Sequence, residues 1–460
     1  MSEPKATHRN NDLLNGPIYD TLKRMTLPMI VGMIMLMTFG LVDTFFVSML
    51  GTDELAAISF TFPVTFTIIS LNIGLGIGTS ATIGRSLGSG ETHLAKEFAT
   101  GALMLSFILV GALAFIGYLT IEPVFRAMGA TEELLPYIKD YMYLWYAAAI
   151  FLAVPMVGNS VLRAAGDTKT PSIIMASGGL INVILDPIFI FGWGPIPAMG
   201  IQGAALATAI AWGVGLVYII YLLAIKRKLM LPRLLTFSEL KLTSGGVLRI
   251  GLPAAGANML TPIAGGVITA IVAGYGPEAV AAWGVGSRLE SIASILVLAL
   301  SMSLPPFISQ NYGANKTSRV RSSYILSLKF VLIIQFAIYL ILCLVAPYIA
   351  ALFAEEQKVA DLIVLFLYIV PLGYGLQGVV ILTNSSFNAM HQPMSALILS
   401  IIRLFVFFVP LAYLGSEWLN IKGMFFGIIL ANLCIAVVAY AWFSQSLNKH
   451  SQPIQITKET

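Results

Sequence analysis

The apolar positions of this chain form long uninterrupted runs, and short segments that hold most of the charged residues separate them. A helix needs about 20 mostly apolar residues to cross a bilayer, and about twelve runs reach that length. Strands of a membrane barrel would instead alternate apolar and polar residues. The pattern predicts an all-α integral membrane protein with spans near residues 22–48, 54–84, 95–119, 135–160, 169–193, 201–225, 246–274, 279–310, 320–346, 359–387, 393–415 and 421–446.

Composition agrees with a chain whose main solvent is lipid. Of its 460 residues, 58% are hydrophobic and 10% are charged, whereas a soluble domain carries roughly a quarter charged residues. The mean hydropathy is +0.87. The apolar run from Met25 onward is too long for the core of a signal peptide, so we expect the first span to remain as an anchor.

Basic residues collect at both ends of the chain and after every second span, and acids dominate the segments between. Because cytoplasmic segments carry the excess of lysine and arginine, we expect a multi-pass protein of the cytoplasmic (inner) membrane with both termini in the cytoplasm. The basic positions that support this orientation are Lys5, Arg9, Lys23, Arg24, Arg85, Lys96, Arg163, Lys169, Lys226, Arg227, Lys228, Arg233, Lys241, Lys316, Arg319, Arg321, Lys449 and Lys458.

The chain repeats itself at an offset of 225 residues, since 253 − 28 = 225 relates two Leu-Pro pairs. We predict an N-terminal six-helix lobe at 1–225, a cytoplasmic linker at 226–245 and a C-terminal six-helix lobe at 246–460. Six spans per lobe make the repeats parallel, which suits alternating access around a central cleft. The pairs at this offset include Pro28 with Pro253, Gly51 with Gly276, Asp53 with Glu278, and Gly88 with Gly313.

Glycines and basic residues outside the repeat pairs have simple interpretations. Gly74, Gly76, Gly78 and Gly84 lie within one apolar run with no strand before them, so they predict close helix packing and not a dinucleotide site. The basic run of the linker predicts a cytosolic tether that meets anionic lipid headgroups.

Five polar side chains lie within apolar runs of the N-terminal half, where polar and charged groups are costly and usually mark function. Asp43 lies deep in the first span. Asn182 and Asp186 share a face of the fifth span because they are four residues apart. Thr208 lies in the sixth span, and Asn159 lies late in the fourth. These residues form the predicted cation- or proton-binding site.

The repeat makes this polar set asymmetric. Polarity that only supported the scaffold should tend to recur in both halves, so we interpret the set as a site. A buried hydrogen-bond network that only fixes helix packing is the alternative. The positions equivalent to Asp43, Asn182, Asp186 and Thr208 in the second half are Ile268, Leu404, Phe408 and Ile428.

Two ions suit this set. Burial disfavours a charged carboxylate, and a second carboxylate nearby disfavours it further. If Asp43 and Asp186 lie close together, they titrate as a coupled pair, and one of them can hold an exchangeable proton. Na⁺ is the alternative, because two carboxylates, the Asn182 carbonyl and the Thr208 hydroxyl are hard oxygen donors. The residues alone do not separate the two ions.

The C-terminal half has polar residues of its own. Arg288 and Glu290 lie early in the eighth span and Arg403 lies in the eleventh. The pair of Arg288 and Glu290 can line the cleft or bridge helices, and both interpretations stay open. His391 precedes Pro393 at a helix start, where a solvated loop histidine is expected.

Three stretches of the first half, GLVDTFFVSMLGTDELAAISF, RAAGDTKTP and INVILDPIFIFGWGPIPAMGIQGAALATAIA, resemble the MATE (multidrug and toxic compound extrusion) transporters. Among these, the chain resembles the DinF-like branch from about residue 15 to 448. The resemblance implies twelve helices in two six-helix bundles that form a V-shaped cleft. It also implies export of amphipathic or cationic organic compounds in exchange for protons or sodium.

The resemblance assigns roles residue by residue. It makes Asp43 the proton-linked residue and Pro28 the point of helix bending, and it places Asn159, Asn182, Asp186 and Thr208 in the site. Related members can carry a tyrosine one turn before the aspartate, and this chain has Phe39 there, so a mechanism that needs that hydroxyl is in doubt.

We therefore expect a secondary active multidrug efflux antiporter that exports amphipathic or cationic organic compounds in exchange for protons through the aspartate site of the N-terminal lobe. We expect it to contribute to antibiotic resistance and not to be an enzyme. The alternatives are a Na⁺-coupled drug antiporter with the same site, or a lipid-linked oligosaccharide flippase of the same superfamily, which would need more cations in its spans. We expect no cofactor beyond the coupling ion, H⁺ or Na⁺. The expected partners of a monomer are small-molecule drugs, organic cations and the lipid bilayer, with no nucleic acid.

Overall fold

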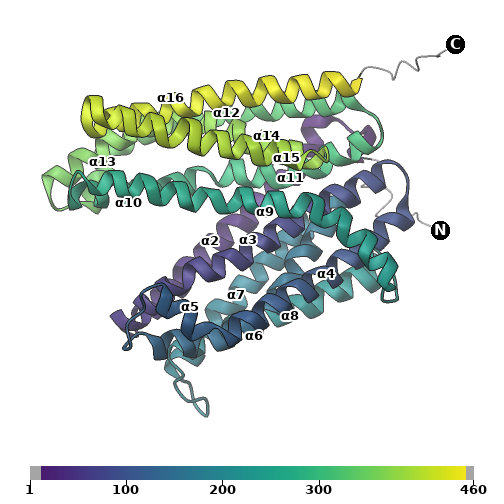
Figure 1. Ribbon diagram of the computed structural model, residues 1–460, viewed down its shortest axis with the longest axis horizontal. Coiled ribbons are helices and arrows are strands. Elements are labelled where there is room, and N and C mark those ends of the chain that lie inside the picture. Colours follow the sequence, from purple (N-terminus) through teal and green to yellow (C-terminus); the bar gives the residue numbers. More distant parts are fainter. Residues whose placement is uncertain (1–11, 452–460) are drawn as a thin grey trace.

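The computed structural model describes residues 12–451, and helices make up almost all of them (Figure 1). Lys5, Arg9 and Lys458 lie outside the described residues. The first half contains α2 (Ile18–Ser48), α3 (Thr52–Gly88), α4 (Thr92–Leu119), α5 (Ile121–Ala127), α6 (Leu135–Ala164), α7 (Lys169–Phe191), α8 (Ile201–Tyr221) and the π-helix η1 (Leu222–Lys226). The second half contains α9 (Phe237–Ala273), α10 (Pro277–Ala293), α11 (Ile295–Gly313), α12 (Thr317–Phe353), α13 (Gln357–Ile369), the short 3₁₀-helix η2 (Val370–Gly373), α14 (Tyr374–Ala389), α15 (Pro393–Ile401), the π-helix η3 (Ile402–Phe408) and α16 (Val409–Ser451).

Eleven helical stretches of the described chain are long and apolar enough to cross a membrane. The last of them, Pro393–Lys449, is interrupted inside α16 because Leu419 and Asn420 have non-helical backbone angles. Across this break, a Cβ on Gly423 would lie 1.9 Å from the carbonyl oxygen of Gly415, so the chain reverses and the stretch holds two spans. The predicted all-α membrane fold of about twelve spans is confirmed.

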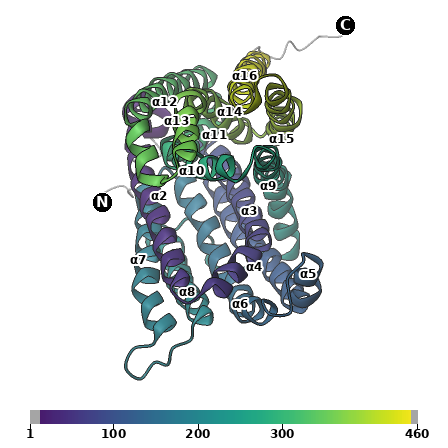
Figure 2. The ribbon, with the colours of Figure 1, turned by 90° about the vertical axis from the view of Figure 1, so that its left-hand side faces the viewer.

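Two helical lobes form a V (Figure 1). We call α2 to η1 the N-lobe and α9 to α16 the C-lobe. The lobes meet near the two ends of the described chain, which we call the terminal end, and diverge toward α5 and α13 at the opposite end. Figure 2 shows α9 of the C-lobe beside α3 of the N-lobe, where the two lobes touch. The V-shaped arrangement of two bundles is therefore confirmed.

Repeat-related residues join α3 to α11 at the terminal end. A Cβ on Gly88 would lie 2.1 Å from the carbonyl oxygen of Gln310, and a Cβ on Gly313 would lie 2.3 Å from that of Arg85. The offset of 225 residues relates Gly88 to Gly313 and Arg85 to Gln310, so one contact is made twice about a pseudo-twofold axis. Glycine is required because any side chain would hold the two backbones apart.

The same axis relates two further contacts between the lobes. A Cβ on Gly74 of α3 would lie 2.3 Å from the carbonyl oxygen of Gly251 on α9, and Gly78 approaches α9 equally closely. At the related place on the other side, Thr26 of α2 and Ser303 of α11 share a buried hydrogen bond of 2.7 Å. The glycines of α3 therefore pack helices closely, as predicted; Gly74, Gly78 and Gly84 do so between the lobes, whereas Gly76 faces Ser160 of α6 within the N-lobe.

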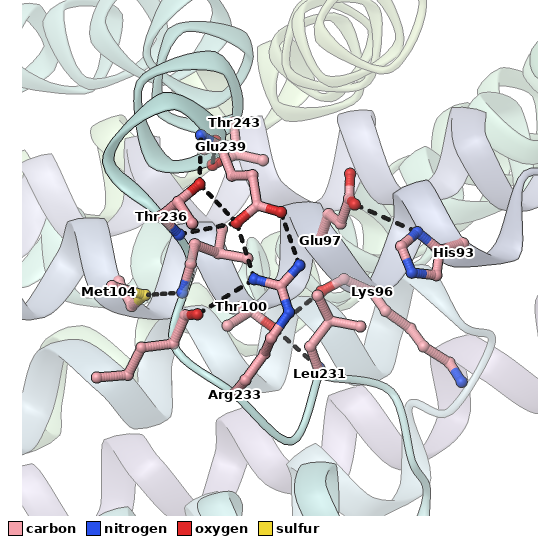
Figure 3. A network of polar contacts seen from close by, with 12 residues as sticks. His93, Lys96, Glu97, Thr100, Met104, Leu231, Arg233, Thr236, Glu239 and Thr243 are labelled. Carbon is pink, nitrogen blue, oxygen red and sulfur yellow. Dashed lines mark hydrogen bonds and ion pairs between the residues drawn. The ribbon is translucent and has the colours of Figure 1, made fainter.

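The segment between the lobes is packed onto the N-lobe (Figure 3). The backbone N–H of Leu231 donates to Oγ1 of Thr100 on α4 at 2.9 Å, and Arg233 donates to both carboxylate oxygens of Glu239 at 2.8 and 2.6 Å. Thr236 and Glu239 form a capping box that starts α9 at Phe237, inside the segment 226–245. The linker is thus an ordered strap along α4, which its basic composition did not indicate.

Candidate functional site

Close packing between α2 and α7 positions the acidic residues of the N-lobe (Figure 2). A Cβ on Gly179 of α7 would lie 1.7 Å from Cδ2 of Phe39 on α2, so the ring of Phe39 occupies the space of a side chain. Asp43 lies one turn further along α2. The missing side chain at Gly179 therefore lets α2 approach α7 closely enough to bring Asp43 beside Asp186.

Asn182 connects the polar groups of α7 and α8. Its Nδ2 donates to Oδ1 of Asp186 and to Oγ1 of Thr208, each at 3.2 Å. Asp186 is fully buried, Asp43 is partly buried, and their carboxyl groups lie within hydrogen-bonding reach of each other. Among the described residues, Oδ1 of Asp43 and Oδ2 of Asp186 are buried without a hydrogen-bond donor. A proton held by one carboxyl would give the other its missing donor.

The structure adds one residue to this cluster and separates another from it. Tyr141 of α6 lies within electrostatic range of both Asp43 and Asp186. Asn159 lies 18 residues further along α6, which is about 27 Å at the rise of an α-helix, and it makes no described contact with the cluster. A tyrosine at a span start is common in membrane proteins, so the sequence offered no signal for Tyr141.

The second half places an apolar cluster at the equivalent positions. Ile268 and Ile428 are buried together in one core cluster of the C-lobe, and Phe408 packs against it. Leu404 is also buried. The asymmetry read from the repeat is therefore an asymmetry in space, with the acidic cluster in one lobe and hydrocarbon in the other.

Pro28 lies inside α2, on the terminal side of the acidic cluster. Its ring nitrogen cannot donate to the carbonyl of Arg24, so α2 lacks one hydrogen bond there. The helix is nevertheless continuous from Ile18 to Ser48. Bending at this point stays a prediction.

The polar residues of the C-lobe do not form the pair that the sequence suggested. Glu290 accepts a hydrogen bond of 3.1 Å from Nε2 of Gln377. Arg288 is exposed and points elsewhere, because residues two apart lie on different helix faces. Arg403 lies on η3, and its Nε has no partner among the described residues. Among residues 12–451, no group of three or more His, Cys, Asp or Glu side chains could hold a metal ion.

His391 is not the solvated loop histidine that was expected, so that prediction is wrong. Its side chain is partly buried at the terminal end, and Nε2 donates to the carbonyl oxygen of Ala81 on α3 at 3.1 Å. The sequence could not show this contact, because His391 and Ala81 belong to different lobes and are 310 residues apart.

Comparisons with known proteins agree with this geometry. The MatE family model matches the chain twice, at residues 28–188 and 253–414. An FAD transporter of Shewanella oneidensis is 43% identical over 428 residues, covering 93% of this chain and 95% of that protein. A probable multidrug resistance protein of Bacillus subtilis, YoeA, is 28% identical over 401 residues, covering 86% of each chain.

Solved structures agree as well. The crystal structure of the Vibrio cholerae MATE transporter VcmN in the bent form superposes with a TM-score of 0.89 at 35% identity, and the match covers 96% of this chain and 99% of that one. The family profile covers more than half of the residues, in both lobes, and the folds coincide. The chain belongs to the MatE family, the MATE transporters.

Proposed function

We propose that this transporter exports its cargo in exchange for protons, and that the carboxyl groups of Asp43 and Asp186 carry the exchanged proton. The observation that supports this proposal is the contact between two buried carboxyls, each with one oxygen that lacks a donor. Two carboxylates cannot donate to each other, so one shared proton satisfies both groups. Opening the site to water on either side of the membrane would exchange that proton.

In the proposed cycle the protein works as a monomer in the inner membrane. Its terminal end faces the cytoplasm. The state described here has its terminal end closed by the contacts of α3 with α9 and α11. A proton from the outside neutralises the pair of Asp43 and Asp186. The hydrogen bonds of Asn182 then rearrange, α2 bends near Pro28, and the cargo leaves. The transporter then closes toward the outside and opens at the terminal end, and the proton leaves to the inside. Proton and cargo must bind the two states with different affinities, because a ligand shifts an equilibrium between states only by its differential affinity.

The orientation of Asn182 favours protons over sodium. Its amide nitrogen faces both Asp186 and Thr208, whereas a sodium ion would require the amide oxygen to point at the ion. A sodium site would therefore need the amide to turn over and the Thr208 hydroxyl to turn from acceptor to donor. The shared proton needs neither change.

For the cargo we propose flavin adenine dinucleotide, the substrate in the name of the Shewanella oneidensis relative. That relative is 43% identical over nearly the whole chain, against 28% for the multidrug resistance protein. The hydroxyl and imide N–H groups of a flavin dinucleotide can donate to the carboxylates of Asp43 and Asp186, and protonation of these acceptors weakens their hold. Amphipathic organic cations are the second candidate, because the Bacillus subtilis relative is named a probable multidrug resistance protein and the carboxylates would attract a cation.

Transport into proteoliposomes with pH and sodium gradients imposed separately tests both parts. We expect FAD flux to follow the pH gradient and to fall at least tenfold in Asp43→Asn, while Asp53→Asn, a change of an exposed acid at the start of α3, leaves it unchanged. Flux driven by sodium alone would refute proton coupling. Flux of a cationic dye without flux of FAD would replace the flavin with the second candidate.

A further inference from the structure

A non-glycine residue occupies a left-handed backbone position at the terminal end. His391 lies in the turn between α14 and α15 with φ = +60°, and the N–H of the next residue, Gln392, donates to the carbonyl of Phe387 at 2.9 Å. This is the helix-ending motif that usually has glycine at this place. The repeat-related turn has glycine there, since 391 − 166 = 225 and Gly166 has φ = +80°.

Histidine at this position carries a free-energy cost from its left-handed backbone conformation. A side-chain-bearing residue in the left-handed region costs roughly 1–2 kcal/mol, which glycine avoids. The side chain must therefore contribute something that the backbone turn does not need, and its hydrogen bond to Ala81 of the other lobe identifies that contribution. The bond crosses the interface that closes the terminal end.

The surroundings of the ring make its contact sensitive to protonation. Burial, together with the positive charges of Arg85 on α3 and Arg249 on α9, lowers the pKa of His391 from 6.5 to about 4, and the bond to Ala81 only partly opposes this. Glu91 and Tyr312 are the other titratable groups on the wall of the adjoining cavity. In the state with joined lobes the ring therefore stays neutral at physiological pH.

The cavity supplies a path for the proton. It has a volume of about 490 Å³, which is ample for water, and residues of both lobes line it, among them Thr82 and Phe98 of the N-lobe and Asn315 and His391 of the C-lobe. If the lobes part, the ring leaves Ala81 and Arg85 of the N-lobe and meets water, while Arg249 stays with it in the C-lobe. Its pKa then returns toward 6.5.

We propose that the neutral side chain of His391 latches the two lobes together at the terminal end, and that protonation of its ring favours their separation. The latch is distinct from the pair of Asp43 and Asp186, because it lies at the other end of the molecule and joins the lobes directly. The sign follows from linkage. A pKa that is lower in the joined state means that acid on the terminal side favours the separated state, with most of the effect between pH 6.5 and pH 4.

Spin labels at the terminal end test this proposal in lipid nanodiscs. The labels replace Thr92 and Ser318, exposed residues in the first turns of α4 and α12, in a chain whose Cys343 and Cys434 are changed to serine. The Asp43→Asn and Asp186→Asn changes are both included so that neither carboxyl of the acidic cluster contributes a proton. From the two pKa values, the ratio of separated to joined lobes should rise by up to about 30-fold between pH 8 and pH 5.

Two substitutions separate the latch from a structural role. His391→Asn tolerates the left-handed turn and keeps a neutral donor, so the pH response should disappear while joining at pH 8 is retained. His391→Gly relieves the backbone strain and therefore folds, but it should shift the lobes toward separation at every pH. His93→Gln, which changes an exposed histidine paired with Glu97, should keep the full response.

A pH response that survives in His391→Asn, or one that is absent with His391 in place, would overturn the latch. Unchanged joining in His391→Gly at pH 8 would do the same. Because the measurement reports lobe distances in a chain with both Asp43→Asn and Asp186→Asn, its outcome does not depend on the cargo or on proton coupling through these carboxyls. Failure of the latch and failure of the proposed function are therefore distinguishable.

Discussion

The contact between α3 and α11 predicts how a single methyl group should redistribute the states of the transporter. A Cβ on Gly88 would lie 2.1 Å from the carbonyl oxygen of Gln310, whereas ordinary contacts begin near 3.4 Å. The two backbones must therefore part locally by about 1.3 Å in Gly88→Ala. Backbone atoms cannot swing aside as a flexible side chain can, so the strain falls on the joined terminal end.

Overpacking of this kind costs typically about 1–3 kcal/mol. Since 1.4 kcal/mol is a factor of ten in an equilibrium, the joined state should lose about 5- to 150-fold in population relative to the separated state. The double change Gly88→Ala with Gly313→Ala should cost less than twice the free energy of one, because both contacts, at 2.1 and 2.3 Å, join the same two helices and parting the backbones at one relieves the other.

Electron–electron distance measurements would follow the opposite end of the molecule. Labels at Asp53 at the start of α3 and at Glu356 before α13, both exposed, should move closer as the terminal end separates. The matched control is Gly265→Ala on α9, where an added Cβ meets nothing within 4 Å. If Gly88→Ala and Gly265→Ala gave the same distance distribution, the packing argument would be refuted.

Three further predictions follow from contacts outside this interface. Gly179→Ala should displace the ring of Phe39, move Asp43 away from α7 and lower proton-driven flux, and Phe39→Ala in the same chain should restore flux if the clash is the cause. Thr236→Ala removes the capping box of α9 and should cost about 1 kcal/mol locally, seen as faster amide exchange in the strap along α4 with unchanged exchange in α6. The hydrogen bond from Lys139, supported by Arg126, holds the pKa of Glu122 below its usual 4.5. The parent should therefore have a higher thermal midpoint than Glu122→Gln at neutral pH, and this difference should shrink as the pH falls below 4.5. A difference that persists unchanged in acid would argue against this bond.

Some features of the candidate site could be predicted from the sequence. Asp43, Asn182, Asp186 and Thr208 were recognised because charged and polar groups are rare in apolar spans. The approach of Asp43 to the other three depends on one glycine, Gly179, whose role depends on the ring of Phe39 that faces it. Asn159 is also a polar residue in an apolar span, yet in the structure it lies far along α6 from the other four. The sequence could not show this, because the presence of a residue within one span does not tell how deep it lies relative to residues of another span.

Hydropathy and the internal repeat by themselves determined the number of spans, the division into two lobes and the lobe that carries the acids. These features depend on whether each segment is surrounded by lipid or by water. Tertiary structure alone decided that Tyr141 lies within electrostatic range of the acids, that the segment between the lobes packs along α4 and that His391 contacts the other lobe. Those contacts link residues far apart in the chain, and their energies depend on the distances and burial that packing creates. Local patterns of polarity cannot encode such distances, because each pattern reports only on its own helix.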